Sequence, residues 1–148
     1  MKPKKIEDDV KSFSDEWQSI TMTYSDYARS VGISYTSLQI LKYITGTENC
    51  TQKTICEMSF LPKQTVNTII TGFYKKGYIE LRELPEDRRT KTIHLTEKGR
   101  KYMDTFSPHI EEAEYEAMQS LSEEQRTMLV EGIRLYGKIF REKLLEVK

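Results

Sequence analysis

Several residue types and patterns that mark whole classes of protein are scarce in this sequence. No apolar run is long enough to cross a membrane, and no signal-peptide pattern follows the cationic segment 1–5. The two cysteines, Cys50 and Cys56, are too few for a disulfide framework or a four-ligand zinc site. We therefore expect a cytoplasmic protein that holds no metal and no other cofactor.

Motifs of enzymatic chemistry are equally scarce. The sequence has only two histidines, His94 and His109, and no HExxH-type pair. It also has no nucleophile elbow and no glycine-rich phosphate loop. These absences argue against an enzyme and favour a binding protein.

Charged residues are present in balance but are unevenly distributed. Segment 63–101 carries ten Lys or Arg against five Asp or Glu, a net charge of +5, whereas segments 1–62 and 102–148 carry −1 and −4. Screening limits the reach of each charge to about 10 Å or less in physiological salt, so a local cationic patch is enough to attract phosphates. Segment 63–101 is therefore the candidate nucleic-acid-binding part of the chain.

Residues 62–76 predict an amphipathic helix at the start of this segment. Four apolar residues have the i, i+3, i+4, i+7 spacing of a buried helix face: Val66, Ile69, Ile70 and Phe73. The remaining face is uncharged or cationic and carries Lys63, Gln64, Thr65, Asn67, Thr68 and Thr71. Many of these residues are β-branched and favour a strand by propensity, but the helical spacing over more than two turns decides for a helix. Pro62 suits its first position and Gly77 its end.

A helix-turn-helix followed by a β-hairpin accounts for segment 34–99. Ser34 is expected to cap one helix and Thr51 a short second helix that ends at Met58. The turn 59–61 leads into helix 62–76, and the alternating runs 78–84 and 91–95 form the hairpin. The apolar side chains expected to face inward in the hairpin are Ile79, Leu81, Ile93 and Leu95. A helix with a polar face beside a cationic hairpin is typical of a winged helix-turn-helix that binds duplex DNA.

Long helices are predicted on both sides of this unit. Segment 6–31 has a heptad seam typical of a helix that packs along a partner, although an amphipathic core helix gives similar spacing. After the hairpin we expect a long helix, capped by Thr96 and carrying an apolar face from Tyr102 to Ala117. A capping box at Ser122–Gln125 opens a sixth helix with its own apolar seam: Leu129, Ile133, Tyr136 and Phe140. The predicted fold is mainly α with a small β-hairpin, a single domain over 1–148 with six helices and one wing, in which 6–31 and 102–146 serve dimerisation.

Segment 87–99, Asp-Arg-Arg-Thr-Lys-Thr-Ile-His-Leu-Thr-Glu-Lys-Gly, closely resembles the wing of the MarR family of transcriptional regulators. The family pattern reads Asp-x-Arg, a short basic strand, and Leu-Thr-x-x-Gly. Segments 64–66 and 75–79 resemble the start and the end of that family's recognition helix. The resemblance implies a homodimer that presents two winged helices to a palindromic site and that responds to a small ligand or an oxidant. This chain departs from the family at Thr68 and Gly72, where many relatives carry charged residues, and it lacks the first-helix cysteine of the redox-sensing branch.

Twelve residues are candidate DNA contacts. Asn and Gln can bind adenine, Thr can contact the thymine methyl group, and Lys can reach guanine or phosphate. At the hairpin tip, Arg89 can enter the minor groove, while Asp87 is expected to shape the turn and to orient Arg89 through an ion pair. The candidates are Thr51, Gln52, Lys63, Gln64, Thr65, Asn67, Thr68, Arg82, Asp87, Arg88, Arg89 and Lys91. The alternatives are a solvated helix face, a surface salt bridge at Asp87, and simple capping by Thr51.

Six aromatic residues are candidates for a pocket that binds a small aromatic or amphipathic effector: Phe13, Trp17, Tyr24, Tyr27, Tyr35 and Tyr43. Packing in the core or at a dimer interface is the alternative for each of them. We expect Cys56 to be packed and Cys50 to be more exposed. The sequence therefore predicts a ligand-responsive homodimeric repressor that binds double-stranded operator DNA and no membrane, the alternative being a winged-helix protein whose main partner is another protein or RNA.

Overall fold

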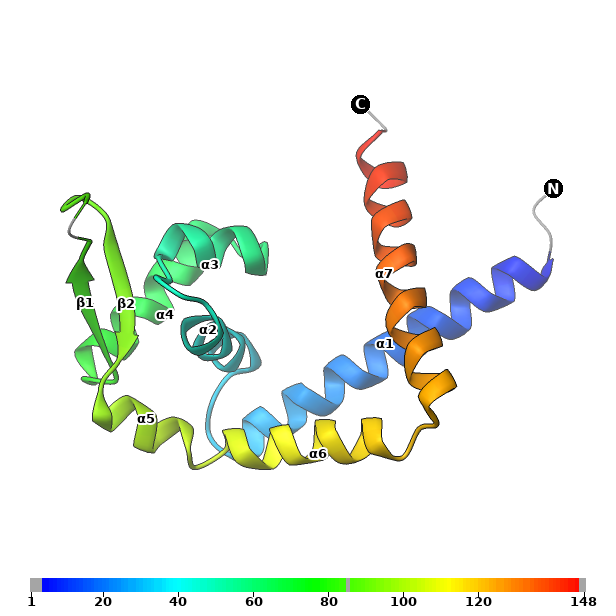
Figure 1. Cartoon of the computed structure of the whole chain (residues 1–148), viewed down its shortest axis with the longest axis horizontal. Helices are drawn as coiled ribbons and strands as arrows, with labels where there is room; N and C mark the ends of the chain where they lie inside the picture. The colour runs from blue at the N-terminus through cyan, green and yellow to red at the C-terminus, as the bar shows by residue number, and fades with distance from the viewer. Residues whose placement is uncertain (1–3, 85, 147–148) are drawn as a thin grey trace. The chain divides into compact units, whose positions relative to one another are not determined.

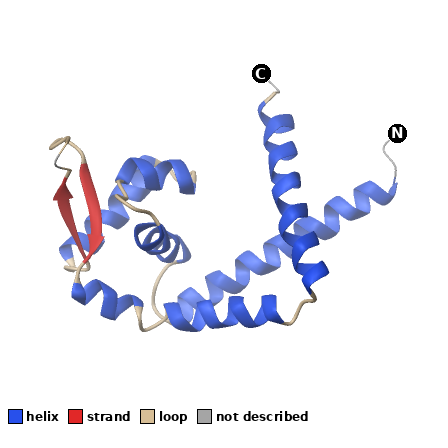
Figure 2. Cartoon of the chain, viewed as in Figure 1, coloured by secondary structure: helices blue, strands red, loops and turns tan. Residues whose placement is uncertain are grey.

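The computed structural model describes residues 4–84 and 86–146, and these residues form seven helices and one two-stranded antiparallel sheet (Figures 1 and 2). The fold class expected from the sequence, mainly α with a small hairpin, is confirmed. The elements in chain order are α1 (Lys4–Ser30), α2 (Tyr35–Gly46), α3 (Gln52–Ser59), α4 (Lys63–Lys75), β1 (Ile79–Glu83), β2 (Lys91–Leu95), α5 (Glu97–Met103), α6 (Ser107–Gln119) and α7 (Glu123–Leu145). The chain divides into two compact units, one up to Thr105 and one from Phe106 onward.

Side-chain caps begin four of these helices where the sequence predicts them. The hydroxyl oxygens of Ser34, Thr51 and Thr96 accept hydrogen bonds from backbone N–H groups in the first turns of α2, α3 and α5. At α7 the predicted capping box is complete, because Ser122 and Gln125 each accept from the other's backbone N–H. Each cap satisfies a donor that the helix itself cannot use.

The predicted long fifth helix is wrong, because the structure divides it into α5 and α6. The break falls at residues 104–106, and Pro108 lies in the first turn of α6. Proline has no N–H to donate to a carbonyl four residues earlier and its ring clashes there, so a continuous helix cannot pass through this position. The first turn of a new helix tolerates proline.

Buried apolar side chains from α2, α3, α4 and the sheet form the core of the first unit. Val66, Ile70 and Phe73 are buried on α4 as their spacing predicts, although Ile69 is only half-buried. The remaining large members are Leu38, Ile40, Leu41, Ile44, Ile55, Ile79, Ile93 and Leu95. Segment 63–75 is therefore a helix despite its β-branched composition, because the helix buries this apolar face in the core.

A short backbone segment before α3 extends the sheet. Thr51 pairs with Thr92 of β2, and the Ile93 N–H donates to the Cys50 carbonyl at 2.8 Å. This pairing leaves Cys50 only 1% exposed, whereas Cys56 is intermediate. The expectation that Cys50 is the more exposed thiol is therefore wrong, because the backbone of residues 50–51 is bonded to β2 rather than lying in an open loop.

The hairpin has the predicted pairing with one exception in its burial. Ile79 lies opposite Leu95 and Leu81 opposite Ile93. Ile79, Ile93 and Leu95 are buried, but Leu81 is 44% exposed, so the expectation that it faces inward is wrong. Ile93, directly opposite Leu81, is buried because Thr51 pairs with β2 and α2 packs against it, whereas Leu81 lies on β1, the outer strand at this point.

Two helices carry apolar side chains that the chain itself leaves exposed. On α1 they include Ile6, Val10, Trp17 and Ile20, and on α7 they include Leu129, Ile133, Tyr136 and Phe140. No helix in residues 4–84 or 86–146 combines the length and the apolar composition that a membrane span needs.

Candidate nucleic-acid interface

Helix α4 presents the polar face that the sequence predicts. Lys63, Gln64, Asn67 and Thr68 are exposed, and Thr65 is half-buried. The Thr68 hydroxyl donates to the Gln64 carbonyl at 2.9 Å, so its hydrogen-bonding proton is used within the helix. The face offers two amide side chains and one cation along its first two turns.

The N-terminal end of α4 has no side-chain cap. Pro62 is the residue before the first helical position rather than that position itself, and no side chain accepts from the first-turn N–H groups. The first turn also contains no acidic residue. Free N–H donors and the positive end of the helix dipole make this terminus able to accept an anion such as a phosphate.

Thr51 and Gln52 lie at the start of α3. The Thr51 side chain accepts from the Thr54 N–H at 3.1 Å, so it is a helix cap, and both Thr51 and Gln52 are half-buried. The partial burial of these two side chains leaves part of each open to a backbone phosphate.

The wing tip is a turn built around Asp87. Its carboxylate accepts from the Arg89 N–H at 3.0 Å and from the Thr90 hydroxyl at 2.7 Å. The hydrogen bond from Thr90, followed by that from the Arg89 N–H, lowers the pKa of Asp87 below its usual value, so the turn is held by a carboxylate that is ionised at neutral pH. The expected shaping of the turn by Asp87 is therefore present.

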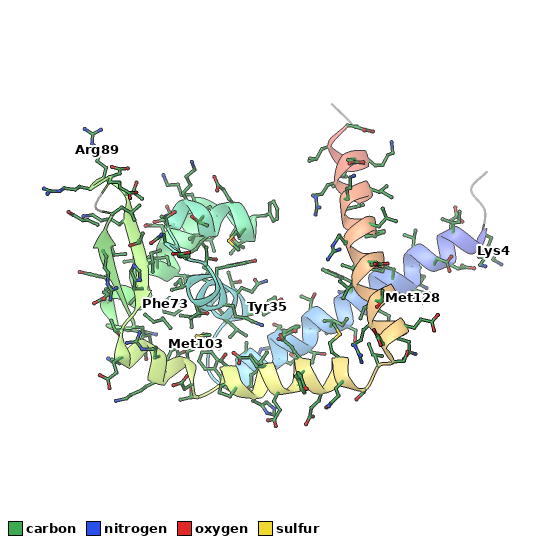
Figure 3. All side chains as sticks on the ribbon, in the orientation of Figure 1. Lys4, Tyr35, Phe73, Arg89, Met103 and Met128 are labelled. Carbon is green, nitrogen blue, oxygen red and sulfur yellow. The ribbon has the colours of Figure 1, made fainter. Side chains whose placement is uncertain are left out.

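The guanidinium of Arg89 projects away from the tip (Figure 3). In the described part of the chain no ion pair joins it to Asp87, so the expected orienting salt bridge is not found. The reason is that the Asp87 oxygens are engaged by the turn itself. Arg88 and Arg89 are both exposed and therefore accessible to an external anion.

The other two cationic candidates of the wing have carboxylate partners. Arg82 pairs with Glu80 on the same strand, and Lys91 pairs with Glu83 across the hairpin. All four side chains are between about half and two-thirds exposed, so solvent screens both pairs. Such pairs can exchange their carboxylate for a phosphate at little cost.

A tight joint attaches the end of α4 to the start of α5. The Thr96 hydroxyl donates to the Gly77 carbonyl at 2.6 Å, and the Gly99 N–H donates to the Thr96 oxygen at 3.0 Å. A Cβ at Gly99 would lie 1.9 Å from the Tyr78 carbonyl oxygen, so only glycine fits. Leu95 before this joint is buried in the core. The Leu-Thr-x-x-Gly pattern at 95–99 is thus explained by packing, and it fixes the wing against the helix it follows.

The turn between α3 and α4 contains a residue that the sequence did not single out. Phe60 has φ +55 in the left-handed region, which costs a non-glycine residue about 1–2 kcal/mol, and its side chain is 84% exposed. The sequence indicates a turn at 59–61 but carries no glycine there, and this absence is the signal that could have drawn attention to it.

Three of the six candidate effector residues line one cavity of about 310 Å³ in the first unit. They are Tyr24, Tyr35 and Tyr43, and they are joined there by Leu38, Gln39 and Lys42. The rings of Tyr24 and Tyr35 stack with their centroids 5.9 Å apart. Phe13, Trp17 and Tyr27 are not among its lining residues; Phe13 and Trp17 stack on each other instead.

Two observations bear on thiol and metal chemistry in the described residues. Burial raises the pKa of Cys50 to about 11, so this thiol stays protonated near neutral pH. Residues 4–84 and 86–146 contain no group of three or more His, Cys, Asp or Glu side chains placed to hold a metal ion.

Comparison with known protein families finds a similarity in the part of the chain that contains the helix-turn-helix and the wing. A family model described as "MarR family" matches residues 31–90, which run from the end of α1 to the wing tip. Residues 31–90, which contain the helix-turn-helix and the first strand of the wing, are therefore similar to the MarR family. The match includes residues 87–90 of the segment that resembles the MarR wing, so the resemblance to that family is confirmed.

Relatives and solved structures show the same similarity. The "HTH-type transcriptional regulator SarZ" of Staphylococcus epidermidis is 29% identical over 90 residues, which cover 61% of this chain and 61% of SarZ. A MarR family regulator from Neisseria meningitidis has the same fold, with a TM-score of 0.80, 22% identity and coverage of 95% of this chain and 99% of that one. Streptococcus pneumoniae FabT, solved in complex with DNA, gives a TM-score of 0.75 at 18% identity and covers 93% of this chain and 98% of its own. At these identities the structural likenesses establish the MarR fold alone.

Proposed function

We propose that this MarR-type chain is a transcriptional regulator that binds double-stranded DNA in a sequence-specific manner. The observation that carries the proposal is the juxtaposition, within one compact unit, of an uncapped helix with a polar face and a hairpin tipped by two exposed arginines. SarZ is named a transcriptional regulator and FabT was solved with DNA, and both support this reading.

Helix α4 reads the major groove in this proposal. Its N-terminal half carries Gln64 and Asn67, which can bind adenine through two hydrogen bonds, and Lys63, which can reach guanine or phosphate. Thr65 and Thr68 add methyl groups for contact with thymine. The half-buried side chains of Thr51 and Gln52 at the start of α3 bind phosphates of the DNA backbone.

The wing binds the adjacent minor groove. Arg89 enters the groove where narrow AT-rich sequence concentrates negative potential, and Arg88 contacts the flanking phosphate. Arg82 and Lys91 exchange Glu80 and Glu83 for phosphates. Asp87 contacts no DNA in this arrangement, because its carboxylate holds the turn.

The chain acts as a homodimer. Residues 6–31 and 102–146 provide the dimerisation helices, whose exposed apolar seams on α1 and α7 would otherwise remain in water. Two winged helices then lie about one turn of DNA apart, so the operator is a pseudo-palindrome of about 16–20 base pairs. Residues 34–99 form the DNA-binding part.

Repression is released by a small aromatic or amphipathic effector. The cavity lined by Tyr24, Tyr35 and Tyr43 has the size and the aromatic lining of a small-molecule site. An effector that prefers one spacing of the two winged helices shifts the population away from the DNA-binding state. The regulator is cytoplasmic, needs no cofactor and catalyses no reaction.

The decisive experiment is the substitution Arg89→Ala. Operator affinity is expected to fall at least tenfold at physiological salt, with the dimer and its unfolding transition unchanged, because the Arg89 side chain makes no hydrogen bond or ion pair with the described residues and its backbone hydrogen bond to Asp87 is kept. Lys101→Ala removes the same charge outside the predicted contacts and is the matched control. Equal affinities of the Arg89→Ala variant and the wild type, measured by fluorescence anisotropy, would remove the wing from DNA recognition.

A further inference from the structure

The turn residue Phe60 is held in a conformation and an environment that both oppose folding. Its φ of +55 lies where L-residues other than glycine and asparagine are disfavoured. Its side chain is 84% exposed, the largest value among the exposed large hydrophobic residues in the described part of the chain. An exposed ring contributes little to the stability of the fold. Folding alone therefore gives no reason for a phenylalanine here.

The turn that carries this ring is fixed. The Phe60 N–H donates to the Cys56 carbonyl at 3.0 Å, which closes the end of α3. The Leu61 N–H donates to the Ser59 hydroxyl oxygen at 3.2 Å, and Pro62 follows with its restricted φ of −57. The backbone beneath the ring is thus ordered before any partner arrives, which lowers the entropic cost of a contact.

The surface that continues from Phe60 into α4 suits an anionic partner. Lys63 follows three residues later, and the first turn of α4 has neither an acidic residue nor a side-chain cap. The nearest preceding carboxylate, Glu57, lies 3.8 Å from the Lys53 ammonium and is partly neutralised. The surface therefore suits an anion beside an apolar group, and under the proposed function that anion is a phosphate of DNA.

We propose that Phe60 is a DNA-contact residue whose ring packs on apolar groups at the edge of the major groove. Those groups are the methyl of a thymine or the carbons of a deoxyribose, which offer the same apolar chemistry. The inference rests on the proposed function, because it requires that the N-terminal end of α4 enters the groove. It explains why the chain tolerates a strained and exposed aromatic residue at this turn.

The test uses the full-length dimer and the duplex that the wild-type protein selects from a randomised pool. Phe60→Gly and Phe60→Asn both accept a positive φ and remove the ring. We expect each to bind about five- to tenfold more weakly while the Tm stays the same or rises by a few degrees. Phe60→Leu keeps an apolar side chain and is expected to retain most of the affinity.

Two further readouts separate this contact from other causes. The slope of log affinity against log salt is expected to stay unchanged in the Phe60 variants, because no phosphate contact is lost. In the Lys63→Ala variant the magnitude of this slope is expected to fall by about one, because one phosphate contact is lost. Asn49→Gly relieves the other positive φ of a non-glycine residue in the described part of the chain, φ +50, and is expected to leave binding unchanged.

Replacing the thymines of the duplex by deoxyuridine, one position at a time, identifies the contacted group. A position where the wild type loses affinity and Phe60→Gly loses none further assigns the methyl, whereas additive losses at every position assign the deoxyribose. Unchanged affinity of Phe60→Gly overturns the proposal, and so does wild-type binding by Phe60→Asn, because turn rigidity would then explain the glycine result. A marked fall of Tm in both variants overturns it as well, since the ring would then serve the fold. Failure of the wild type to select any duplex refutes the proposed function itself and is seen before any variant is made.

Discussion

Gly99 has a structural role that its residue type alone does not reveal. Gly99 is a helical residue with φ in the ordinary range, yet a Cβ there would meet the Tyr78 carbonyl oxygen at 1.9 Å. Tyr78 also stacks on Tyr102 at 4.3 Å, so the carbonyl cannot move without disturbing that pair. The joint between α4 and α5 therefore depends on the absence of one carbon atom.

Gly99→Ala is expected to destabilise the protein by about 1–3 kcal/mol, although alanine favours a helix, because overpacking outweighs propensity. Gly72→Ala is the matched control, since a Cβ on this glycine of α4 meets nothing within 4 Å and should add up to about 1 kcal/mol of stability. Urea denaturation measures both changes. A stabilised Gly99→Ala variant would show that the joint is looser than its geometry implies.

The two cysteines are expected to react at very different rates. Cys50 is 1% exposed and burial raises its pKa to about 11, so at pH 8 its reactive thiolate is a minor species. Iodoacetamide should modify Cys56 in the native protein and both thiols after unfolding in urea, as read by mass spectrometry. A native Cys56→Ser variant should stay unmodified on the same timescale. Rapid modification of that variant would contradict the burial of Cys50.

At the scale of elements, the wing is a cationic hairpin that partly neutralises itself. Lys91 pairs with Glu83 and Arg82 with Glu80, while the tip arginines pair with no carboxylate in the described residues. In the proposed complex, DNA must therefore displace carboxylates along the strands of the wing but not at its tip. Carboxylates of the wing and phosphates of DNA would therefore compete for Arg82 and Lys91, which the net charge of segment 63–101 does not reveal.

Glu83→Gln is expected to raise affinity for the selected duplex about two- to fivefold at low salt, because Lys91 is freed and an exposed pair is worth only about 0.2–1 kcal/mol. The gain should shrink as salt is added. Glu86→Gln removes a carboxylate from the wing loop without freeing a cation and controls for general repulsion. Equal gains in the two variants, measured by anisotropy, would mean that the Lys91–Glu83 pair does not compete with phosphate.

For the whole molecule, the exposed apolar seams are the feature that a single chain cannot explain. Leu129, Ile133, Tyr136 and Phe140 on α7 are each 40–50% exposed, and Tyr136 stacks on Phe140 within the row. A second copy of the chain is the partner that the proposed function supplies. Winged helices must also come in pairs to read a palindrome.

Ile133→Glu is expected to convert the dimer to a monomer and to abolish operator binding, because a charge would be buried in an apolar interface without a partner. Lys138→Glu lies away from the seam on the same helix and should leave the dimer intact. Sedimentation velocity measures the assembly. A wild-type monomer, or a Ile133→Glu variant that still sediments as a dimer, would contradict this arrangement.

The parts of the protein that depend on local chemistry could be predicted from residue types and their spacing. Hydroxyl caps at Ser34, Thr51, Thr96 and Ser122 satisfy nearby N–H groups, so helix starts could be predicted from residue type and spacing. The apolar period of α4 and the wing pattern at 87–99 likewise predict the winged helix and the MarR family. The twelve candidate DNA contacts come from the same local patterns and stay predictions.

Features that depend on packing between distant segments became visible only in the folded chain. The pairing of residues 50–51 with β2 buries Cys50, and it covers β2 while Leu81 on the outer strand β1 stays exposed. The Asp87 oxygens bond to the turn rather than to the Arg89 side chain, and three of six candidate aromatics reach one cavity. In each case a side chain's surroundings are supplied by residues far away or by a competing hydrogen bond, and residue spacing along the chain carries no record of either.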